Sequence, residues 1–412
     1  MIEVTFPDCS GLDVHKKSVT ACVMVPKRDG GIKPEIRTFK TITAELRALS
    51  AWLHAHQIEQ VVMESTGVYW KPIFNILAPD FDVWLVNARH VSQVPGRKTD
   101  VGDAEWLTSL MRHGLLCKSF IPEVEQRDLR DLTRYRARLL NEKAAAANRL
   151  QKVLEDANIK ISSVLTDIQG VSARLMLDAI IAGRTDAEQL AELAKGRLRH
   201  KIPDLVAALC GRVRAHHRFM LQETLNHLDE LNARIASLNE RIQALTVADK
   251  TLITRLIAIT GVGQRTAEIL LAEIGREVKH FPSAKHLASW ACVCPGNNIS
   301  ASKRRSGKTR KGQKWLNAAL TEAAWAASHA KDAYLAAQFQ RIRARRGAKR
   351  AAVAVAHSII TIVYHLLKNP QATFQELGGD FFIKRNKVQQ QRWAVRTLET
   401  LGFQVALAPT PA

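Results

Sequence analysis

The sequence has little that would suit an extracellular or membrane protein. Its six cysteines are scattered, at positions 9, 22, 117, 210, 292 and 294, and a single C-x-C pair is a poor zinc signal. We therefore expect reduced, mostly buried thiols in a cytosolic protein. The first residues, MIEVTFPDCSG, lack a basic segment followed by an apolar run, so no signal peptide is expected. No uncharged apolar run is long enough to span a bilayer.

Acidic residues are few relative to basic ones. The 412 residues include 60 Lys and Arg but 39 Asp and Glu, a formal net charge of +21. This excess indicates a polyanionic partner, most simply nucleic acid. A merely basic soluble protein, such as a ribosome-associated factor, is the simpler alternative. A membrane surface fits less well, because the basic residues are not confined to one amphipathic helix. The length predicts two to four domains.

The first 120 residues alternate between strand and helix patterns. Runs rich in β-branched residues predict strands, and Leu46, Leu49, Trp52 and Leu53 lie on one face of a predicted helix. The predicted strands are Cys9–Val14, Ser18–Val25, a segment near Ile36–Phe39, Val61–Met63 and Val83–Val86, with the helix at Thr43–His56. Strands that alternate with helices predict an α/β layer with a mixed sheet.

Four acidic side chains fall near the ends of these elements. Asp13 lies in or just after the first strand, and Glu64 ends a later one. Asp100 and Asp103 begin a predicted helix, where two carboxylates are often only partners of the helix dipole. However, ligand sites in open α/β sheets lie beyond the carboxyl ends of strands, and converging carboxylates repel one another unless they hold cations. The set therefore favours a site for Mg²⁺ or Mn²⁺, the ions of two-metal phosphodiester chemistry.

Four blocks, GLDVHK, VVMESTGVYW, VNARHV and KTDVGDAEWL, occur in an order and spacing that resemble a known signature. They resemble the Asp-Glu-Asp-Asp (DEDD) motif of the insertion-sequence 110 family of transposases, also called Piv-type recombinases. The resemblance implies an N-terminal domain similar to the RuvC Holliday-junction resolvase, with an RNase H-like fold. It also implies that a catalytic, metal-binding quartet consists of Asp13, Glu64, Asp100 and Asp103. His15 and Lys16 are interpreted as solvated or phosphate-facing.

The middle of the chain, about 121–250, is predicted to be helical. A long helix over Leu129–Ile161 has a basic surface that is either a solvated face or a nucleic-acid contact. The arginines and lysines of this surface are Arg130, Arg134, Arg136, Arg138, Lys143, Arg149 and Lys152. Residues 163–213 predict shorter helices, broken at Gly170, Gly183, Gly196 and Pro203.

A heptad repeat follows in Phe219–Leu245. Its apolar positions are Leu221, Leu228, Ile235 and Ile242, together with Thr224, Leu231, Leu238 and Leu245. This pattern predicts a coiled coil, either with the long helix of the same chain or with another subunit. The family resemblance favours a homo-oligomer, a dimer or tetramer, because recombination must hold two DNA partners together.

The C-terminal domain, about 251–370, begins with ITGVG at 259–263. Its glycines allow a tight turn, and the segment is similar to a helix-hairpin-helix element. Gly261 and Gly263 are therefore candidate phosphate contacts, and an ordinary helical packing unit is the alternative.

A basic loop follows the turn at Pro295-Gly296. Its candidate nucleic-acid contacts are Lys303, Arg304, Arg305, Lys308, Arg310 and Lys311. A serine in such a loop is usually a phosphate ligand or part of a linker. The loop resembles the second conserved block of the same transposases, which implies that Ser300 is a nucleophile that forms a covalent phosphoserine link to DNA. Ile299 replaces a commonly acidic residue and Ser302 a common glycine; Ser302 and Ser306 are alternative nucleophiles.

The remaining residues are helical and basic. Arg341–Arg350 is predicted to contact phosphates, and Ala351–Leu367 is apolar but too short to span a membrane comfortably. Residues 371–412 form a basic tail that we expect to be partly disordered.

The resemblance, with the basic charge, implies a DNA transposase that acts on element ends and target DNA in the cytoplasm, at the nucleoid. The resemblance also implies a bridge RNA as guide. Two alternatives stay open. One is a junction resolvase that cuts with metal alone, and the other is a non-catalytic nucleic-acid-binding scaffold.

Overall fold

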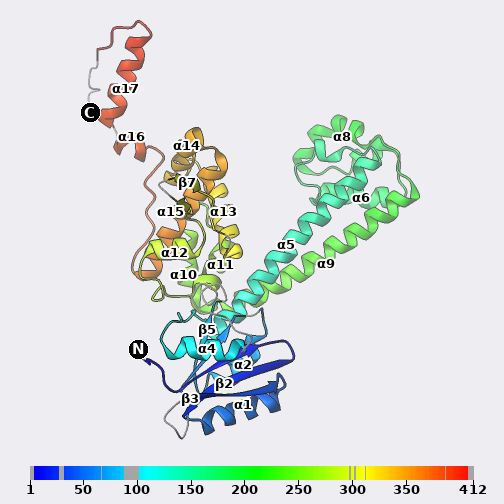
Figure 1. Cartoon of the computed structure of the whole chain (residues 1–412). Helices are drawn as coiled ribbons and strands as arrows, with labels where there is room; N and C mark the ends of the chain where they lie inside the picture. Colours follow the sequence, from blue (N-terminus) through cyan, green and yellow to red (C-terminus); the bar gives the residue numbers. More distant parts are fainter. Residues whose placement is uncertain are drawn as a thin grey trace. The chain divides into compact units, whose positions relative to one another are not determined.

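The computed structural model describes residues 4–26, 32–65, 67–87, 102–296, 298–300, 303–310, 312–385 and 387–406, and of residues 26, 298–300, 303–306 and 387–390 only the backbone. The chain divides into two compact units, Met1–Pro122 and Glu123–Ala412. Figure 1 shows the helices and strands of both units.

Unit 1 is built on a five-stranded mixed sheet. Its strands are β1 (Cys9–Val14), β2 (Ser18–Pro26), β3 (Ile32–Lys40), β4 (Gln60–Glu64) and β5 (Asp82–Val86), in the order β3-β2-β1-β4-β5. β1, β2 and β3 pair antiparallel, whereas β1, β4 and β5 pair parallel. The predicted mixed sheet is therefore confirmed, and its arrangement is consistent with an RNase H-like domain.

Helices cover both faces of this sheet. On one face, α1 (Thr43–Ala55) and α2 (Trp70–Leu77) pack over a core that includes Leu12, Phe39 and Met63. On the other face, α4 (Asp103–Arg112) packs against Cys9, Val62 and Val86. Because side chains alternate along a strand, Gly11 and Asp13 share the face of Cys9, and Glu64 shares the face of Val62.

Unit 2 begins with two long helices that lie side by side. α5 (Val124–Asp156) and α9 (Ala215–Leu245) form a hairpin, with α6 (Val171–Ile181), α7 (Ala187–Ala191) and α8 (Ile202–Leu209) at its far end (Figure 1). Two 3₁₀ turns, Ile161–Ser163 and Gly196–Lys201, connect these elements. Pro203 was predicted to break a helix but lies in the first turn of α8, where its missing N–H costs no helical hydrogen bond.

Most heptad positions of α9 are buried within this chain, whereas Leu238 and Leu245 are half-buried. Leu221, Leu228, Leu231 and Ile235 belong to a core shared with α5 and the helices at the far end of the hairpin. Ile242 belongs to a second core, at the other end. Of the two predicted partners for the repeat, the structure therefore supports packing inside the chain.

The rest of unit 2 is a mainly helical domain. It contains α10 (Lys250–Ile257), α11 (Gln264–Ile274), α12 (Ala284–Trp290), β6 (Asn298–Ser300), β7 (Lys303–Ser306), α13 (Lys314–Ser328), α14 (Tyr334–Arg346) and α15 (Ala348–Lys368), preceded by a 3₁₀ turn, Val247–Asp249. Two further helices, α16 (Phe381–Arg385) and α17 (Lys387–Thr400), lie in the segment predicted as a tail.

The apolar helix α15 belongs to the core of this domain. It is long and apolar enough to cross a membrane by length and composition alone, and 56% of its most apolar stretch is buried inside the protein. Val355, Ile359 and Val363 are fully buried against the surrounding helices. Burial among helices of the same chain accounts for the apolar sequence.

Candidate functional site

Asp13 and Glu64 lie at neighbouring strand ends in unit 1. β1 and β4 run parallel, and Leu12 lies beside Met63 in their register, so the next pair along is Asp13 and Glu64. Adjacent strands are about 4.8 Å apart, and both side chains face the side that α4 covers. The prediction that both carboxylates meet at one sheet edge is supported by this register.

A close contact fixes the start of α4 over β1. The Gly11 amide donates to Thr108 Oγ1 at 2.8 Å, and that hydroxyl lies 2.7 Å from the Ala104 carbonyl oxygen. A Cβ atom on Gly11 would lie 2.4 Å from the same carbonyl oxygen, which is too close. Glycine at this position therefore allows α4 to approach the strand that carries Asp13, a requirement that the sequence analysis did not identify.

Asp103 is the first residue of α4, and its side chain is exposed. Because Ala104 lies against Gly11, the helix begins above β1, on the face that Asp13 and Glu64 share. The positive end of the helix dipole stabilises a carboxylate at this position. We call Asp13, Glu64 and Asp103 the acidic edge. Asp100, the fourth residue of the predicted quartet, lies outside the described residues.

The chemistry of the acidic edge is that of hard oxygen donors. Asp13 keeps 28% of its side chain exposed, and its Oδ2 lies 3.1 Å from Nε2 of the exposed His15. No described Lys or Arg forms an ion pair with Asp13. Across the described ranges, no group of three or more His, Cys, Asp or Glu side chains is close enough to hold a metal ion. Carboxylate oxygens of this kind suit Mg²⁺ or Mn²⁺.

The predicted serine lies on a small hairpin in unit 2. β6 and β7 pair antiparallel, with Ser300 opposite Lys303 and Asn298 opposite Ser306. At the base, the Gly296 amide donates to the Lys308 carbonyl oxygen at 3.0 Å. Ser300 is therefore the last strand residue before the turn. Ser302 and Lys311 lie outside the described residues, and the side chains of Arg304 and Arg305 are not described.

The predicted basic contacts at this hairpin divide into two kinds. Lys308 is exposed. Arg310 donates from Nη2 to the hydroxyl of Ser289 at 2.6 Å and to its carbonyl oxygen at 3.1 Å. Arg310 thus ties the hairpin to α12, a role that the sequence did not indicate.

The two glycines of the predicted helix-hairpin-helix turn also differ. Gly261 has φ +89°, and a Cβ atom there would lie 2.3 Å from the Ala323 carbonyl oxygen on α13. Packing alone therefore requires glycine at this position. Gly263 has open space around it and precedes α11, so it is the better candidate for contact with a phosphate.

Three arginines of α5 were predicted to form a cationic surface, and for them this prediction is wrong. Arg134 donates to both carboxylate oxygens of Glu273, at 2.6 and 2.7 Å. Arg136 is 2% exposed and binds Glu268. Arg130 donates to the carbonyl oxygen of Ala272 at 2.8 Å. Hydrogen bonds from Arg134 to Glu273 raise the pKa of that guanidinium, whereas burial lowers the pKa of Arg130.

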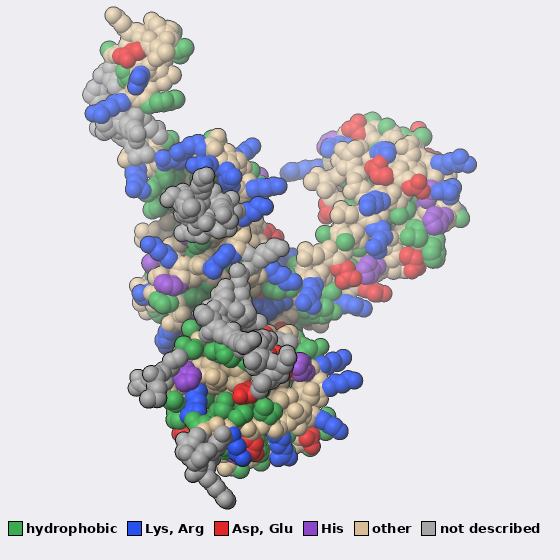
Figure 2. Space-filling model, viewed as in Figure 1, with side chains coloured by type: hydrophobic (Ala, Val, Ile, Leu, Met, Phe, Trp, Pro, Cys, Tyr) green, Lys and Arg blue, Asp and Glu red, His purple; other side chains and the backbone are tan. Residues whose placement is uncertain are grey.

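A basic face remains on α14 and the start of α15. Its exposed side chains are Arg341, Arg343, Arg345, Arg346, Lys349 and Arg350. Figure 2 shows Lys and Arg side chains gathered over the part of unit 2 that carries α13 and α14. This face retains the predicted capacity to contact phosphates.

All six cysteines lie in the part of the chain that the structure describes, and there they form no disulfide. Cys9, Cys22 and Cys292 are buried, whereas Cys117 and Cys210 are exposed, so the expectation of mostly buried thiols holds for only part of the set. Burial raises the pKa of the Cys9 thiol to about 12 and that of Cys22 to about 11. These two thiols therefore stay protonated near neutral pH.

Comparison with known proteins identifies two family models along the chain. Residues 10–159 match a model of IS110-type DEDD proteins, described as "Transposase". Residues 253–340 match a model described as "Transposase IS116/IS110/IS902 family". The chain is also 25% identical over 318 residues to a "Probable family 20 transposase" of Pseudomonas aeruginosa, across 74% of this chain and 83% of that protein.

Proposed function

Because the chain belongs to the insertion-sequence 110 (IS110) family of transposases, we propose that it cuts and rejoins DNA at a composite site. One part is the acidic edge of unit 1, completed by Asp100, and the other is Ser300 of unit 2. Both parts act on the same phosphodiester bond. The observation that carries the proposal is the register of β1 and β4, which sets Asp13 beside Glu64.

The acidic edge fits a divalent cation. Asp13, Glu64 and Asp103, with Asp100, would hold Mg²⁺ or Mn²⁺ through carboxylate oxygens. When bound, such an ion supplies positive charge that stabilises the phosphate oxygens as the phosphodiester reacts. The absence of a described Lys or Arg paired with Asp13 supports this assignment, because a structural carboxylate in this chain, such as Glu273, is paired with arginine.

Ser300 performs the covalent step. Its Oγ loses its proton and attacks the phosphorus atom, and the ester bond from phosphorus to a sugar oxygen breaks. The sugar oxygen takes up a proton and leaves as a hydroxyl. The phosphoserine ester keeps the number of ester bonds constant. A hydroxyl of another DNA end reverses the step and rejoins the strand without a high-energy cofactor.

Basic residues bind and orient the DNA. Lys303 is opposite Ser300 in the hairpin, and Arg304 and Arg305 follow it. Together with Lys308 and Lys311 they neutralise phosphate charge, while the Gly263 turn and the basic face of α14 contact the backbone farther away. The net charge of +21 supports this role.

The partners of the reaction follow from the family. Element ends and target DNA are the substrates, and a bridge RNA selects them. A homo-oligomer, dimer or tetramer, holds the two DNA partners, and the protein acts in the cytoplasm at the nucleoid. The exposed face of α9, opposite its buried heptad seam, is accessible to such assembly.

The experiment is a denaturing-gel assay for covalent protein–DNA adducts. It uses element-end DNA, RNA transcribed from the flank of the element, and Mg²⁺, with the parent chain and the variants Ser300→Ala, Asp13→Ala and Ser306→Ala. We expect an adduct with the parent and with Ser306→Ala, and none with the other two. Mass spectrometry of the adduct peptide identifies the linked serine.

Two outcomes contradict the proposal. Cleavage without adduct, lost in Asp13→Ala and retained in Ser300→Ala, supports a resolvase that cuts with metal alone. DNA binding without any strand cleavage, independent of metal, supports a non-catalytic scaffold.

A further inference from the structure

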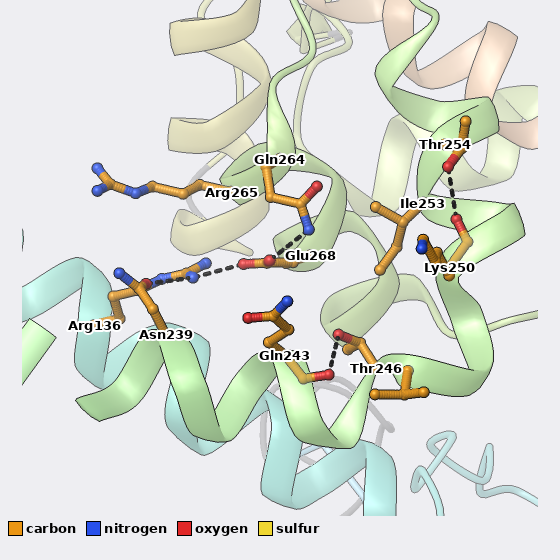
Figure 3. A pocket seen from close by; sticks show the side chains of 11 residues that line it. Arg136, Asn239, Gln243, Thr246, Lys250, Ile253, Thr254, Gln264, Arg265 and Glu268 are labelled. Carbon is orange, nitrogen blue, oxygen red and sulfur yellow. Dashed lines mark hydrogen bonds and ion pairs between the residues drawn. The ribbon is translucent and has the colours of Figure 1, made fainter. Parts of the chain in front are cut away.

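Unit 2 contains a cavity of about 570 Å³ that the proposed chemistry does not use. It lies between α5, α9, α10 and α11, where the base of the helix hairpin meets the C-terminal domain. Figure 3 shows side chains from α9 and α11 pointing toward the same space, among them Gln243, Gln264 and Glu268. Its volume is in the range of about 300–1,000 Å³ that is typical of small-molecule sites.

The floor of this pocket is a buried ion pair between Arg136 and Glu268. Arg136 Nη1 donates to Glu268 at 2.5 Å and to Asn239 Oδ1 at 3.1 Å. The buried Arg136 Nη2 has no hydrogen-bond partner among the described residues. Nη2 is shielded from solvent, so the ion pair closes the floor of the pocket, and recognition of a ligand depends on the groups at the rim.

The rim of the pocket is polar and exposed. Gln243, Lys250 and Arg265 line it and are accessible to solvent. Over the described ranges, neither Lys250 nor Arg265 forms an ion pair, and the Gln243 side chain forms no hydrogen bond. The rim thus offers two cations and an amide that can both donate and accept.

We propose that this pocket binds one unpaired nucleotide of a nucleic-acid strand. The amides of Gln243 and Asn239 match the donors and acceptors on a base edge, and buried Ile253 packs against its ring. Lys250 and Arg265 contact the adjacent phosphates. In a paired duplex the ring faces are stacked and the Watson–Crick edges are hydrogen-bonded to the opposite strand, so a base cannot enter the pocket in this way.

This inference rests on the proposed function in one respect, which is that nucleic acid is the partner. The unpaired nucleotide can belong to an RNA or to a single-stranded segment of the DNA substrate. Both present the same base and phosphate chemistry, so the two sources are distinguished by experiment.

The test measures binding of labelled single-stranded RNA, single-stranded DNA and duplex DNA of equal length to the full chain by fluorescence anisotropy. The variants are Gln243→Ala and Lys250→Ala at the rim, which leave the buried floor intact. Gln222→Ala is the matched control, because Gln222 lies on the same helix outside the pocket and pairs with Asn226. We expect Gln243→Ala to weaken single-strand binding by roughly tenfold and to leave duplex binding unchanged.

If Gln243→Ala weakens binding of single-stranded RNA more than that of single-stranded DNA, the nucleotide belongs to RNA. The reverse result assigns it to the DNA substrate. Equal losses for single strands and duplex, no loss with Gln243→Ala, or no single-strand binding by the parent would overturn the proposal. So would competition by inorganic phosphate as effective as that by nucleoside monophosphates, because it would show an anion site without base recognition.

The adduct assay separates this proposal from the proposed function. If the parent forms no adduct but Gln243→Ala selectively loses single-strand affinity, the nucleotide pocket stands and the serine mechanism fails. If the adduct forms and single-strand binding is insensitive to Gln243→Ala, the pocket proposal fails alone.

Discussion

Asp13 in unit 1 and Glu273 in unit 2 show how differently this chain surrounds its carboxylates. Glu273 is fully buried, accepts two hydrogen bonds from Arg134 and accepts another from Gln313 at 2.8 Å. Asp13 stays partly exposed at the end of β1, beside His15 and the strand that ends in Glu64. The comparison indicates that arginine-paired carboxylates such as Glu273 stabilise the fold, whereas Asp13 forms no ion pair with a described Lys or Arg, as the proposed metal site requires.

The largest effect should follow from changing the acidic edge. Asp13→Asn removes one ligand charge, and we expect strand cleavage and joining to fall by about two orders of magnitude or more. Stability should change little, because the side chain is partly exposed and forms no ion pair with a described Lys or Arg. Single-turnover assays in Mg²⁺ measure the rate. Asp8→Asn, an exposed aspartate just before the same strand, is the control and should retain activity.

A change of the arginine-paired Glu273 should instead lower the stability of the fold. Glu273→Ala leaves Arg134 and Arg130 without their buried partner, and we expect the free energy of unfolding to fall by about 3–5 kcal/mol. Chemical denaturation measures this loss. The control is Glu192→Ala, which breaks an exposed pair with Arg199 and should cost about 1 kcal/mol or less. Equal losses in the two variants would contradict the structural role of Glu273.

A smaller effect should follow from separating α4 from β1. Gly11→Ala places a Cβ atom against the backbone of Ala104 and Thr108, and we expect a loss of about 1–3 kcal/mol in stability. The displaced helix should also lower activity, since it carries Asp103. Gly102→Ala is the stability control, because a Cβ atom there meets nothing within 4 Å. Thermal unfolding of the two variants would show no difference if the close approach were unimportant.

The smallest effect concerns an exposed carboxylate at the end of the C-terminal domain. Partial burial acts to raise the pKa of Glu376. Hydrogen bonds from the Thr260 hydroxyl and from backbone amides, including that of Tyr334, outweigh this effect and lower the pKa. A lowered pKa in the folded state gives stability that is present above the unfolded-state pKa and is lost as the pH falls through the folded-state pKa. We expect this contribution to the free energy of unfolding to be below about 1 kcal/mol, because the carboxylate is exposed.

Unfolding measured at pH 6 and at stepwise lower pH should therefore reveal this contribution. The parent should lose slightly more stability than Glu376→Gln on acidification through roughly pH 4 and below. A parent and a variant with the same pH dependence would show that the hydrogen bonds to Glu376 contribute nothing measurable.

Local patterns predicted the elements of unit 1 well. The strand at Cys9–Val14 has the predicted bounds. The strand at Ser18–Pro26 is close to its predicted bounds, because its β-branched residues are a local signal. The positions of Asp13 and Glu64 follow from the ends of these strands. The approach of α4 was not predicted, although a glycine inside a strand can indicate a close backbone contact.

Long-range pairing could not be read from the sequence. Arg134 and Glu273 are 139 positions apart, and nothing around either residue reveals the other. A run of arginines on α5 therefore resembled a solvated cationic face. The heptad repeat of α9 likewise does not reveal its partner, because its period identifies a buried seam but not the helix that covers the seam. The pocket around Gln243 needs four helices to meet and has no sequence motif.

The most direct test compares the activity of folded molecules for the two carboxylates. Asp13→Asn and Glu273→Ala are assayed for strand cleavage and joining in Mg²⁺, with activity divided by the folded fraction from circular dichroism. We predict that Asp13→Asn is folded and inactive, and that the folded part of Glu273→Ala is as active as the parent. An active Asp13→Asn, or an inactive but fully folded Glu273→Ala, would contradict the assignment of catalysis to the acidic edge.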